Sequence, residues 1–182
     1  MNQLDRFVAG TTKIVAEEKA EAKILARVSP LLSDLISHDD WLEEKYTVPG
    51  PDSYRQYLLY RDPQERFSVI SFVWGPGQKT PVHDHTVWGL VGVMRGAELC
   101  CEFEHDAQGH AKATGHEHVL EKGQIEAVSP TVGDVHTVAN ALTDQPSISI
   151  HVYGADIGRV KRHWYDATTG EAREFVSGYS NA

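Results

Sequence analysis

The amino-acid sequence predicts a mainly β protein that begins with helices. From about Tyr54 onward, short runs rich in Val, Ile, Phe, Tyr and Trp are separated by turns that contain Gly, Pro and Asp. Many short strands at such close spacing are typical of a sandwich or a barrel. The length of 182 residues suits one domain. We therefore expect a single domain over residues 1–182, with a helical N-terminal part over 1–45 and a β-barrel over about 54–176.

The first 45 or so residues show helical periodicity. Apolar residues that share one helix face are Leu4, Phe7 and Val8 in one stretch, and Ile24, Leu25, Val28, Leu32 and Leu35 in the next. Ser29 and Pro30 suit the cap and the first position of a helix, so a helix can restart there. We expect these helices to pack on the part of the chain that follows.

The remaining elements are strands. The segments that suit strands are Tyr54–Tyr60, Phe67–Trp74, Val82–Met94, Glu98–Glu104, His118–Glu121, Ile125–Ser129, Val135–Ala139, Ser147–Tyr153 and His163–Tyr165. The polar stretch from Gln108 to Glu117 is predicted to be a hairpin loop. No internal repeat or linker interrupts this pattern.

Composition excludes several classes of protein. With 26 acidic and 17 basic residues, the chain has a formal net charge of −9, which would repel nucleic-acid phosphates. No stretch approaches the roughly 20 apolar residues of a membrane helix, and the first residues do not resemble a signal peptide. The two cysteines, Cys100 and Cys101, are adjacent, which argues against a disulfide framework. We expect a cytoplasmic protein with no nucleic-acid or membrane partner; the sequence does not predict its oligomeric state.

Ten histidines are the most unusual feature of the composition, and two of them form a His-x-His pair. His83 and His85 lie in a predicted strand, where alternate side chains share a face, so both imidazoles point one way and Asp84 the other. Two imidazoles at this spacing can share a metal ion. Two ordinary surface histidines would give the same pattern, so the pair alone leaves both interpretations open.

Residues around this pair resemble the two signature motifs of the cupin superfamily. The first motif is matched by Gly77, His83, His85 and Gly96, with Gly89 where cupins usually carry a glutamate ligand. The second is matched more loosely, by Gly123, Pro130, Gly133, His136 and Asn140. The resemblance implies a cupin double-stranded β-helix, a jelly-roll-like barrel, with His83, His85 and His136 as metal ligands. Three neutral imidazoles leave a 2+ charge uncompensated, so such a site favours anionic ligands.

A narrower resemblance comes from a later strand. Ser149, His151 and Tyr153 alternate, so a hydroxyl, an imidazole and a phenol share one face and can form a hydrogen-bonded chain. Together with the three histidines, this strand resembles the cysteine dioxygenase family, the nonheme iron thiol dioxygenases of the cupin superfamily. The resemblance implies Fe(II) as cofactor, O2 as co-substrate, a small thiol as substrate and a sulfinic acid as product. It also implies that these three residues are catalytic.

Two departures from the family bear on the substrate. Mammalian-type members carry a cysteine crosslinked to the active-site tyrosine, whereas Gly89 stands at that position here, so we expect Tyr153 to be uncrosslinked. The family's carboxylate-binding arginine is replaced by Gln56, which resembles the bacterial glutamine-type subgroup associated with 3-mercaptopropionate. In that subgroup a later arginine supplies the cation, and Arg162 is the best match, with Arg159 second. An arginine can hold a carboxylate bidentately, whereas an amide cannot compensate its charge.

Several alternatives stay open at this point. Arg55 competes for the carboxylate, although on a strand it faces away from Gln56. The preferred substrate is 3-mercaptopropionate, but within the dioxygenases L-cysteine, cysteamine or mercaptosuccinate could replace it. Outside the dioxygenases, the chain could be a non-catalytic metal-binding cupin, or a cupin isomerase or hydrolase that uses zinc or manganese. A second pair, His116 and His118, is expected to be surface residues, because the sequence offers no obvious third ligand.

Overall fold

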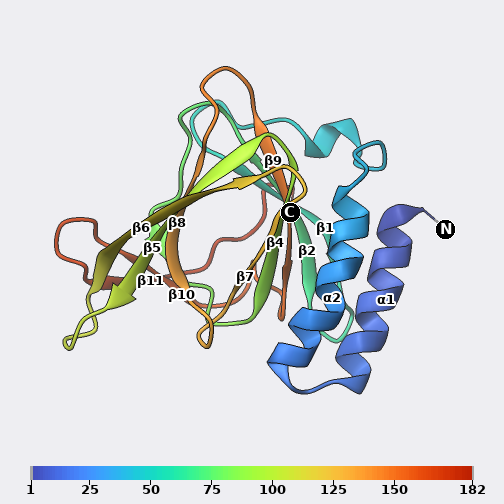
Figure 1. Ribbon diagram of the computed structural model, residues 1–182, viewed down its shortest axis with the longest axis horizontal. Coiled ribbons are helices and arrows are strands. Elements are labelled where there is room, and N and C mark those ends of the chain that lie inside the picture. Colours follow the sequence, from blue (N-terminus) through green and yellow to red (C-terminus); the bar gives the residue numbers. More distant parts are fainter. Residues whose placement is uncertain (1, 182) are drawn as a thin grey trace.

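The computed structural model describes residues 2–181, and in it two helices precede two antiparallel sheets (Figure 1). The helices are α1 (Gln3–Glu17), α2 (Glu21–Ile36) and the short 3-10 helix η1 (Glu44–Tyr46). The strands are β1 (Arg55–Arg61), β2 (Ser68–Trp74), β3 (Val82–His83), β4 (Gly89–Arg95), β5 (Ala97–His105), β6 (Ala111–Glu121), β7 (Ile125–Val128), β8 (Val135–Asn140), β9 (Ser147–Tyr153), β10 (Arg162–Tyr165) and β11 (Ala172–Phe175). The predicted fold class, mainly β with N-terminal helices, is confirmed.

The two sheets form a jelly-roll-like barrel. One sheet has the strand order β1-β2-β9-β4-β7, and the other has the order β11-β10-β3-β8-β5-β6. Neighbours such as β2 and β9, or β3 and β8, are far apart in sequence, as expected for a jelly roll. This order brings the inward faces of β3 and β8 opposite that of β9. The expectation that residues 1–182 form a single domain stays a prediction.

The two long helices cover the outer face of the five-stranded sheet (Figure 1). Buried residues of α2, among them Val28 and Leu32, form one core cluster with residues of β4 and β9, among them Leu90 and Ile150. The helix lies close to β4 because Gly92 has no side chain; a Cβ there would lie 3.3 Å from Leu32. Strands β2 and β9 are therefore buried on both faces, which explains their continuous apolar sequences.

Helix α2 continues through Pro30, so the expected restart at Ser29 is wrong. Pro30 and Ala26 are both exposed, so water can satisfy the Ala26 carbonyl, which loses its usual amide partner. The buried face on both sides of the proline holds the helix against the sheet. Within residues 2–181, no helix combines the length and the apolar character that crossing a membrane requires.

The predicted strand Val82–Met94 is in fact two strands in different sheets. Strand β3 ends at His83, and β4 starts at Gly89. Between them the chain turns at Thr86, whose φ of 60° lies in the left-handed region. His85 therefore lies just outside regular strand structure, in the segment that crosses from one sheet to the other.

The polar stretch Gln108–Glu117 is mostly strand, which corrects the predicted hairpin loop. Strand β6 begins at Ala111 and pairs with β5 over its length, and the turn is confined to the residues before it. Most of β6 is exposed, so its sequence lacks the alternation that marks a half-buried strand. Strand β11, which the sequence pattern did not predict, is likewise mostly exposed.

Candidate functional site

Three histidines converge between the sheets. His83 ends β3, His85 follows it, and His136 lies on β8, directly opposite His83 in the strand pairing. All three are buried, each pair of ring centroids is 4.9 Å apart, and one nitrogen of each ring lies within 4.8 Å of the others. Burial lowers the pKa of His83 well below its ordinary value and that of His136 to about 3. The structure thus brings the three predicted ligands together, and burial keeps the imidazoles of His83 and His136 neutral at pH 7.

The outward nitrogens of two of these rings have fixed partners. The Nδ1 atom of His83 lies 3.1 Å from the Pro81 carbonyl, and that of His85 lies 3.1 Å from Asp134 Oδ1. Asp134 also accepts hydrogen bonds from the backbone N–H groups of His85 and Thr86. Burial acts to raise the pKa of Asp134, but these hydrogen bonds bring it below its ordinary value. Both rings are therefore held with Nε2 free, the arrangement that orients metal-binding histidines.

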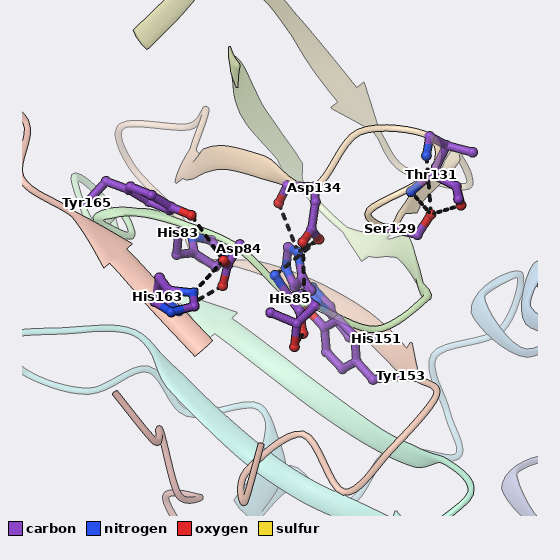
Figure 2. A network of polar contacts seen from close by, with 12 residues as sticks. His83, Asp84, His85, Ser129, Thr131, Asp134, His151, Tyr153, His163 and Tyr165 are labelled. Carbon is purple, nitrogen blue, oxygen red and sulfur yellow. Dashed lines mark hydrogen bonds and ion pairs between the residues drawn. The ribbon is translucent and has the colours of Figure 1, made fainter. Parts of the chain in front are cut away.

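Asp84 points away from the cluster, as strand alternation predicts (Figure 2). Its carboxylate accepts a hydrogen bond of 2.7 Å from the His163 backbone and one of 3.0 Å from the Tyr165 hydroxyl. The Nδ1 atom of His163 lies 2.8 Å from the same carboxylate. These contacts fix the His83–His85 segment to β10, the strand that also carries Arg162.

Ser149, His151 and Tyr153 form a buried hydrogen-bonded chain along β9. Ser149 Oγ lies 2.7 Å from His151 Nε2, and His151 Nδ1 lies 2.8 Å from the Tyr153 hydroxyl. Burial lowers the pKa of His151 and raises that of Tyr153, so the imidazole is neutral and the phenol keeps its proton. The Tyr153 ring stacks on His85 at 5.4 Å between centroids, which places the end of the chain beside the histidine cluster.

Gly89 lies beside the ring of Tyr153, so it bears on the predicted absence of a crosslink. Gly89 lies directly opposite Tyr153 in the pairing of β4 with β9, and a Cβ at residue 89 would lie 2.7 Å from the tyrosine ring. A side chain there would touch the ring, so the residue at this position decides whether a thiol can reach it. With glycine, residue 89 offers no sulfur, consistent with the predicted uncrosslinked Tyr153.

Arg162 lies in the same cavity as the three histidines. This cavity of about 570 Å³ is lined by all three, by Tyr153 and by the arginine. The guanidinium is buried, donates a hydrogen bond of 2.8 Å to Ser177 Oγ and lies 4.8 Å above the Phe175 ring. Its Nε has no hydrogen-bond partner and no carboxylate of residues 2–181 forms an ion pair with it. Burial lowers the pKa of Arg162, which is the cost of holding this charge without a counter-ion.

The other candidate residues for the carboxylate lie in different settings. Arg159 is 65% exposed, pairs with Glu65 and Asp156, and does not line the cavity. Arg55 is half-buried and does line it. Gln56 is buried in the cavity wall, and its amide donates a hydrogen bond to the Gly178 carbonyl.

The C-terminal segment forms one wall of the cavity, a position that no sequence pattern predicted. The lining includes Phe175, Val176, Ser177, Tyr179 and Ser180. Its backbone pairs with β1, because the Ser180 N–H donates to the Gln56 carbonyl and the Gln56 N–H donates to Ser180 Oγ. These residues carry no motif, so only the fold shows that they reach the site.

Glu98 is a further buried polar residue that the sequence analysis did not select. It is fully buried on β5, beside Trp74, Ser147 and Ser149, and its two carboxyl oxygens complete no hydrogen bond of standard geometry with the described residues. Burial raises its pKa to about 8, so the carboxyl is neutral at pH 7. Its sequence signal is an acid at an inward position of an alternating strand, two residues before buried Cys100.

Comparisons with known proteins agree with this geometry. The chain matches the family model for cysteine dioxygenase type I over residues 8–166. Cysteine dioxygenase type 1 of Bos taurus is 23% identical over 113 residues, which cover 61% of this chain and 55% of that protein, so the chain spans about half the length of this relative.

Solved structures with a similar fold are more distant in sequence. A cupin-like protein from Thermotoga maritima is 20% identical, with a TM-score of 0.48 and coverage of 79% of this chain and 93% of that one. A protein with a double-stranded β-helix domain from Klebsiella pneumoniae is 19% identical, with a TM-score of 0.47 and coverage of 65% and 91%. The family match is the informative finding. Because it spans most of the chain, including the three histidines and all of β9, this chain belongs to the cysteine dioxygenase type I family.

Proposed function

We propose that this chain is a thiol dioxygenase that adds both atoms of O2 to the sulfur of a small thiol carboxylate, giving a sulfinic acid. The observation that carries the proposal is the buried Arg162, which has no ion-pair partner among residues 2–181 and lines the same cavity as the three histidines. An unpaired buried charge costs on the order of several kcal/mol. An anionic ligand in the cavity would remove that cost.

The three histidines suit a divalent metal, and we propose Fe(II). His83, His85 and His136 would hold it through one ring nitrogen each, and imidazole suits iron as well as copper, nickel and zinc. Gly89 stands where other cupins place a glutamate, so the protein supplies no anionic ligand at that position. Iron bound here would supply a positive centre for the thiolate and the one-electron chemistry that O2 requires.

Tyr153 is proposed as the catalytic hydrogen-bond donor of the cavity. The Trp74 indole donates to Ser149 Oγ at 3.4 Å, which favours a serine hydroxyl that donates to His151. The neutral imidazole then donates from Nδ1 to the tyrosine oxygen, and the phenol hydrogen is free to point into the cavity. Ser149 and His151 would thus orient the hydrogen bond that Tyr153 donates to the bound reactants.

Arg162 and Gln56 are proposed to position the carboxylate. A guanidinium has a planar set of donors that matches a carboxylate, and the Nε of Arg162 is still unused. The side-chain amide of Gln56 donates one N–H to the Gly178 carbonyl, and its second N–H can donate to the substrate carboxylate. Fixing the substrate at its carboxylate end contributes to catalysis by orientation, which general estimates put at several kcal/mol.

The cavity lining favours 3-mercaptopropionate over L-cysteine. None of the described residues that line the cavity is an Asp or Glu, so the ammonium group of cysteine would find no counter-ion, whereas a carboxylate would meet Arg162. Cysteamine, with an ammonium and no carboxylate, fits least well. The reaction balances without an external reductant, because the thiolate sulfur loses four electrons and O2 takes up four in forming the sulfinate.

The direct test is an oxygen-electrode screen of the Fe(II)-loaded protein with 3-mercaptopropionate, L-cysteine, cysteamine and mercaptosuccinate. We expect 3-mercaptopropionate to give the highest kcat/KM and a sulfinate product by mass spectrometry. Equal or better use of cysteine would refute the substrate assignment. The absence of thiol-dependent oxygen uptake would favour the alternative, a non-catalytic metal-binding cupin.

A matched pair of arginine variants tests the carboxylate assignment. Arg162→Met should raise KM for 3-mercaptopropionate by about 10- to 100-fold, the range for a lost charged hydrogen-bond pair. Arg159→Met removes an exposed arginine outside the cavity and should stay near wild type. If the Arg159 variant shows the larger KM effect, the assignment is wrong.

A further inference from the structure

The second His-x-His pair lies at an irregularity of the β5–β6 hairpin. Cys101 pairs with Glu117, but Phe103 pairs with Ala113, so Glu102 faces three residues of β6. Gly115 adopts a φ of 79°, and the His116 N–H donates to Thr114 Oγ1 at 3.1 Å. Such bulges redirect side chains out of the regular alternation. Here the bulge brings His116 over Glu102.

Three potential ligands meet at this bulge. Glu102 Oε1 lies 2.9 Å from His116 Nδ1 and 3.8 Å from His118 Nδ1. The ligand atoms of the three residues all lie within 4.8 Å of one another. Their side chains are 45%, 65% and 30% exposed in sequence order, so a dissolved ion can reach them.

Glu126 on β7 determines which nitrogen of His118 is free. Its Oε2 lies 3.2 Å from His118 Nε2, and a carboxylate can only accept, so Nε2 carries the hydrogen. The Nδ1 atom is left as an acceptor that is enclosed and has no hydrogen-bond partner among the described residues. It faces the carboxylate of Glu102, another acceptor. Two acceptors that face each other in this way are stabilised by a cation between them.

We propose that Glu102, His116 and His118 bind a zinc ion, with Glu126 as a positioning residue. Two imidazoles and one carboxylate are a common zinc ligand set, which leaves a fourth position for water. The Glu126–His118 contact repeats the carboxylate–histidine arrangement that Asp134 and His85 form at the first cluster.

A second set, Cys100, His118 and Glu126, also has its ligand atoms within 4.8 Å. It is less suited to zinc, because burial raises the pKa of Cys100 and keeps the thiol protonated. Zinc binding through Glu102 and zinc binding through Cys100 share His118 but differ in every other ligand. Variants at residues 100 and 102 therefore distinguish the two sets.

The test is competition for Zn²⁺ between the Fe(II)-loaded protein and a chromophoric zinc indicator, under anaerobic conditions, with iron content measured in parallel. We expect the wild type to bind one zinc ion without losing iron. Glu102→Gln and His116→Ala should each weaken zinc binding at least about 10-fold, and Glu126→Gln should weaken it less. Cys100→Ser and His110→Ala should bind zinc as the wild type does; His110 is an exposed histidine near the same hairpin turn.

Circular dichroism of each variant checks folding, and anomalous diffraction at the zinc edge locates the ion directly. A zinc peak between Glu102 and His118 supports the site. The proposal is overturned if Glu102→Gln and His116→Ala bind zinc as tightly as the wild type, if zinc binds only by displacing iron, or if Cys100→Ser alone abolishes binding. None of these readouts depends on thiol oxidation, so they are independent of the proposed function.

Discussion

The barrel interior and the β5–β6 hairpin each contain a His-x-His pair, and the two pairs differ in how far they are buried. His83 and His85 are buried between the sheets with His136 and line a cavity shared with Tyr153. His116 is exposed on the hairpin of β5 and β6. Figure 1 shows this hairpin on the side of the barrel away from the helices. The same sequence pattern thus gives an enclosed cluster in one region and an open one in the other.

The two clusters have one arrangement in common: a carboxylate contacts one nitrogen of a histidine ring and leaves the other nitrogen free. Asp134 does this for His85, and Glu126 does it for His118. What differs is the surroundings: the first cluster adjoins a buried tyrosine and an arginine that has no ion-pair partner among residues 2–181, while the second cluster faces solvent. The comparison indicates that local geometry prepares histidines for a metal, whereas burial and the neighbouring groups determine whether chemistry can follow.

The largest expected effect comes from removing a histidine of the barrel interior. His136→Ala leaves two imidazoles and no carboxylate ligand, so iron content and thiol-dependent oxygen uptake should both fall to background. His116→Ala should retain iron, because its ring does not reach the cavity. Metal analysis and the oxygen electrode make the measurement, with His110→Ala as the control. If His136→Ala retained all of its iron, the prediction that iron binds at the barrel cluster and not at the hairpin cluster would be wrong.

Much of the fold could be predicted from sequence because burial leaves a pattern. Strands β2 and β9 are buried on both faces, and their apolar runs predicted them closely. Strand β6 was missed because most of its side chains are exposed and its pairing is made by backbone groups that any residue carries. Pro30 predicted a break in α2 that packing overrides. Local sequence patterns fail to predict secondary structure where tertiary contacts determine which strand or helix forms.

The candidate site divides in the same way. The residues that motifs contain, such as His136 and Tyr153, were selected from sequence and lie in one cavity. Asp134 and Glu98 were not selected, because their roles depend on which residues the fold places beside them. Arg162 was preferred to Arg159 from the family resemblance, and the burial of Arg162 in the cavity, which the sequence does not specify, supports that preference.

Two glutamates of β5 extend the comparison to stability. Glu98 is fully buried with a pKa raised to about 8, whereas Glu102 is partly exposed at the open end of the strand. In the unfolded chain the Glu98 carboxyl ionises near its ordinary value of 4.5. The folded state therefore binds the extra proton between about pH 4.5 and 8, and the stability of the wild type should fall as pH rises through this window.

Glu98→Gln has a side chain that cannot ionise, so its stability should not fall as the pH rises through this window. Relative to the wild type, its free energy of unfolding should rise by about 4 kcal/mol between pH 4.5 and pH 8, an upper value from the size of the pKa shift. Urea unfolding at several pH values measures the difference. Glu104→Gln changes an exposed glutamate of the same strand and is the matched control, which should follow the wild type at every pH. A constant offset between Glu98→Gln and the wild type would mean that the carboxyl is not neutral in the folded protein.

The smallest expected effects on metal binding come from replacing the two carboxylates that orient the histidines. These variants also test most directly whether such a carboxylate prepares a histidine to bind a metal. Asp134→Asn weakens the hold on His85 Nδ1 and should lower iron affinity by about 10- to 100-fold, the range for loss of such partners. Glu126→Gln should leave iron affinity unchanged. Chelator competition measures both. If Asp134→Asn leaves iron affinity intact, the ring of His85 is held by barrel packing alone, and the hydrogen-bonded carboxylate would matter only at the open cluster, where Glu126 contacts the more exposed ring of His118.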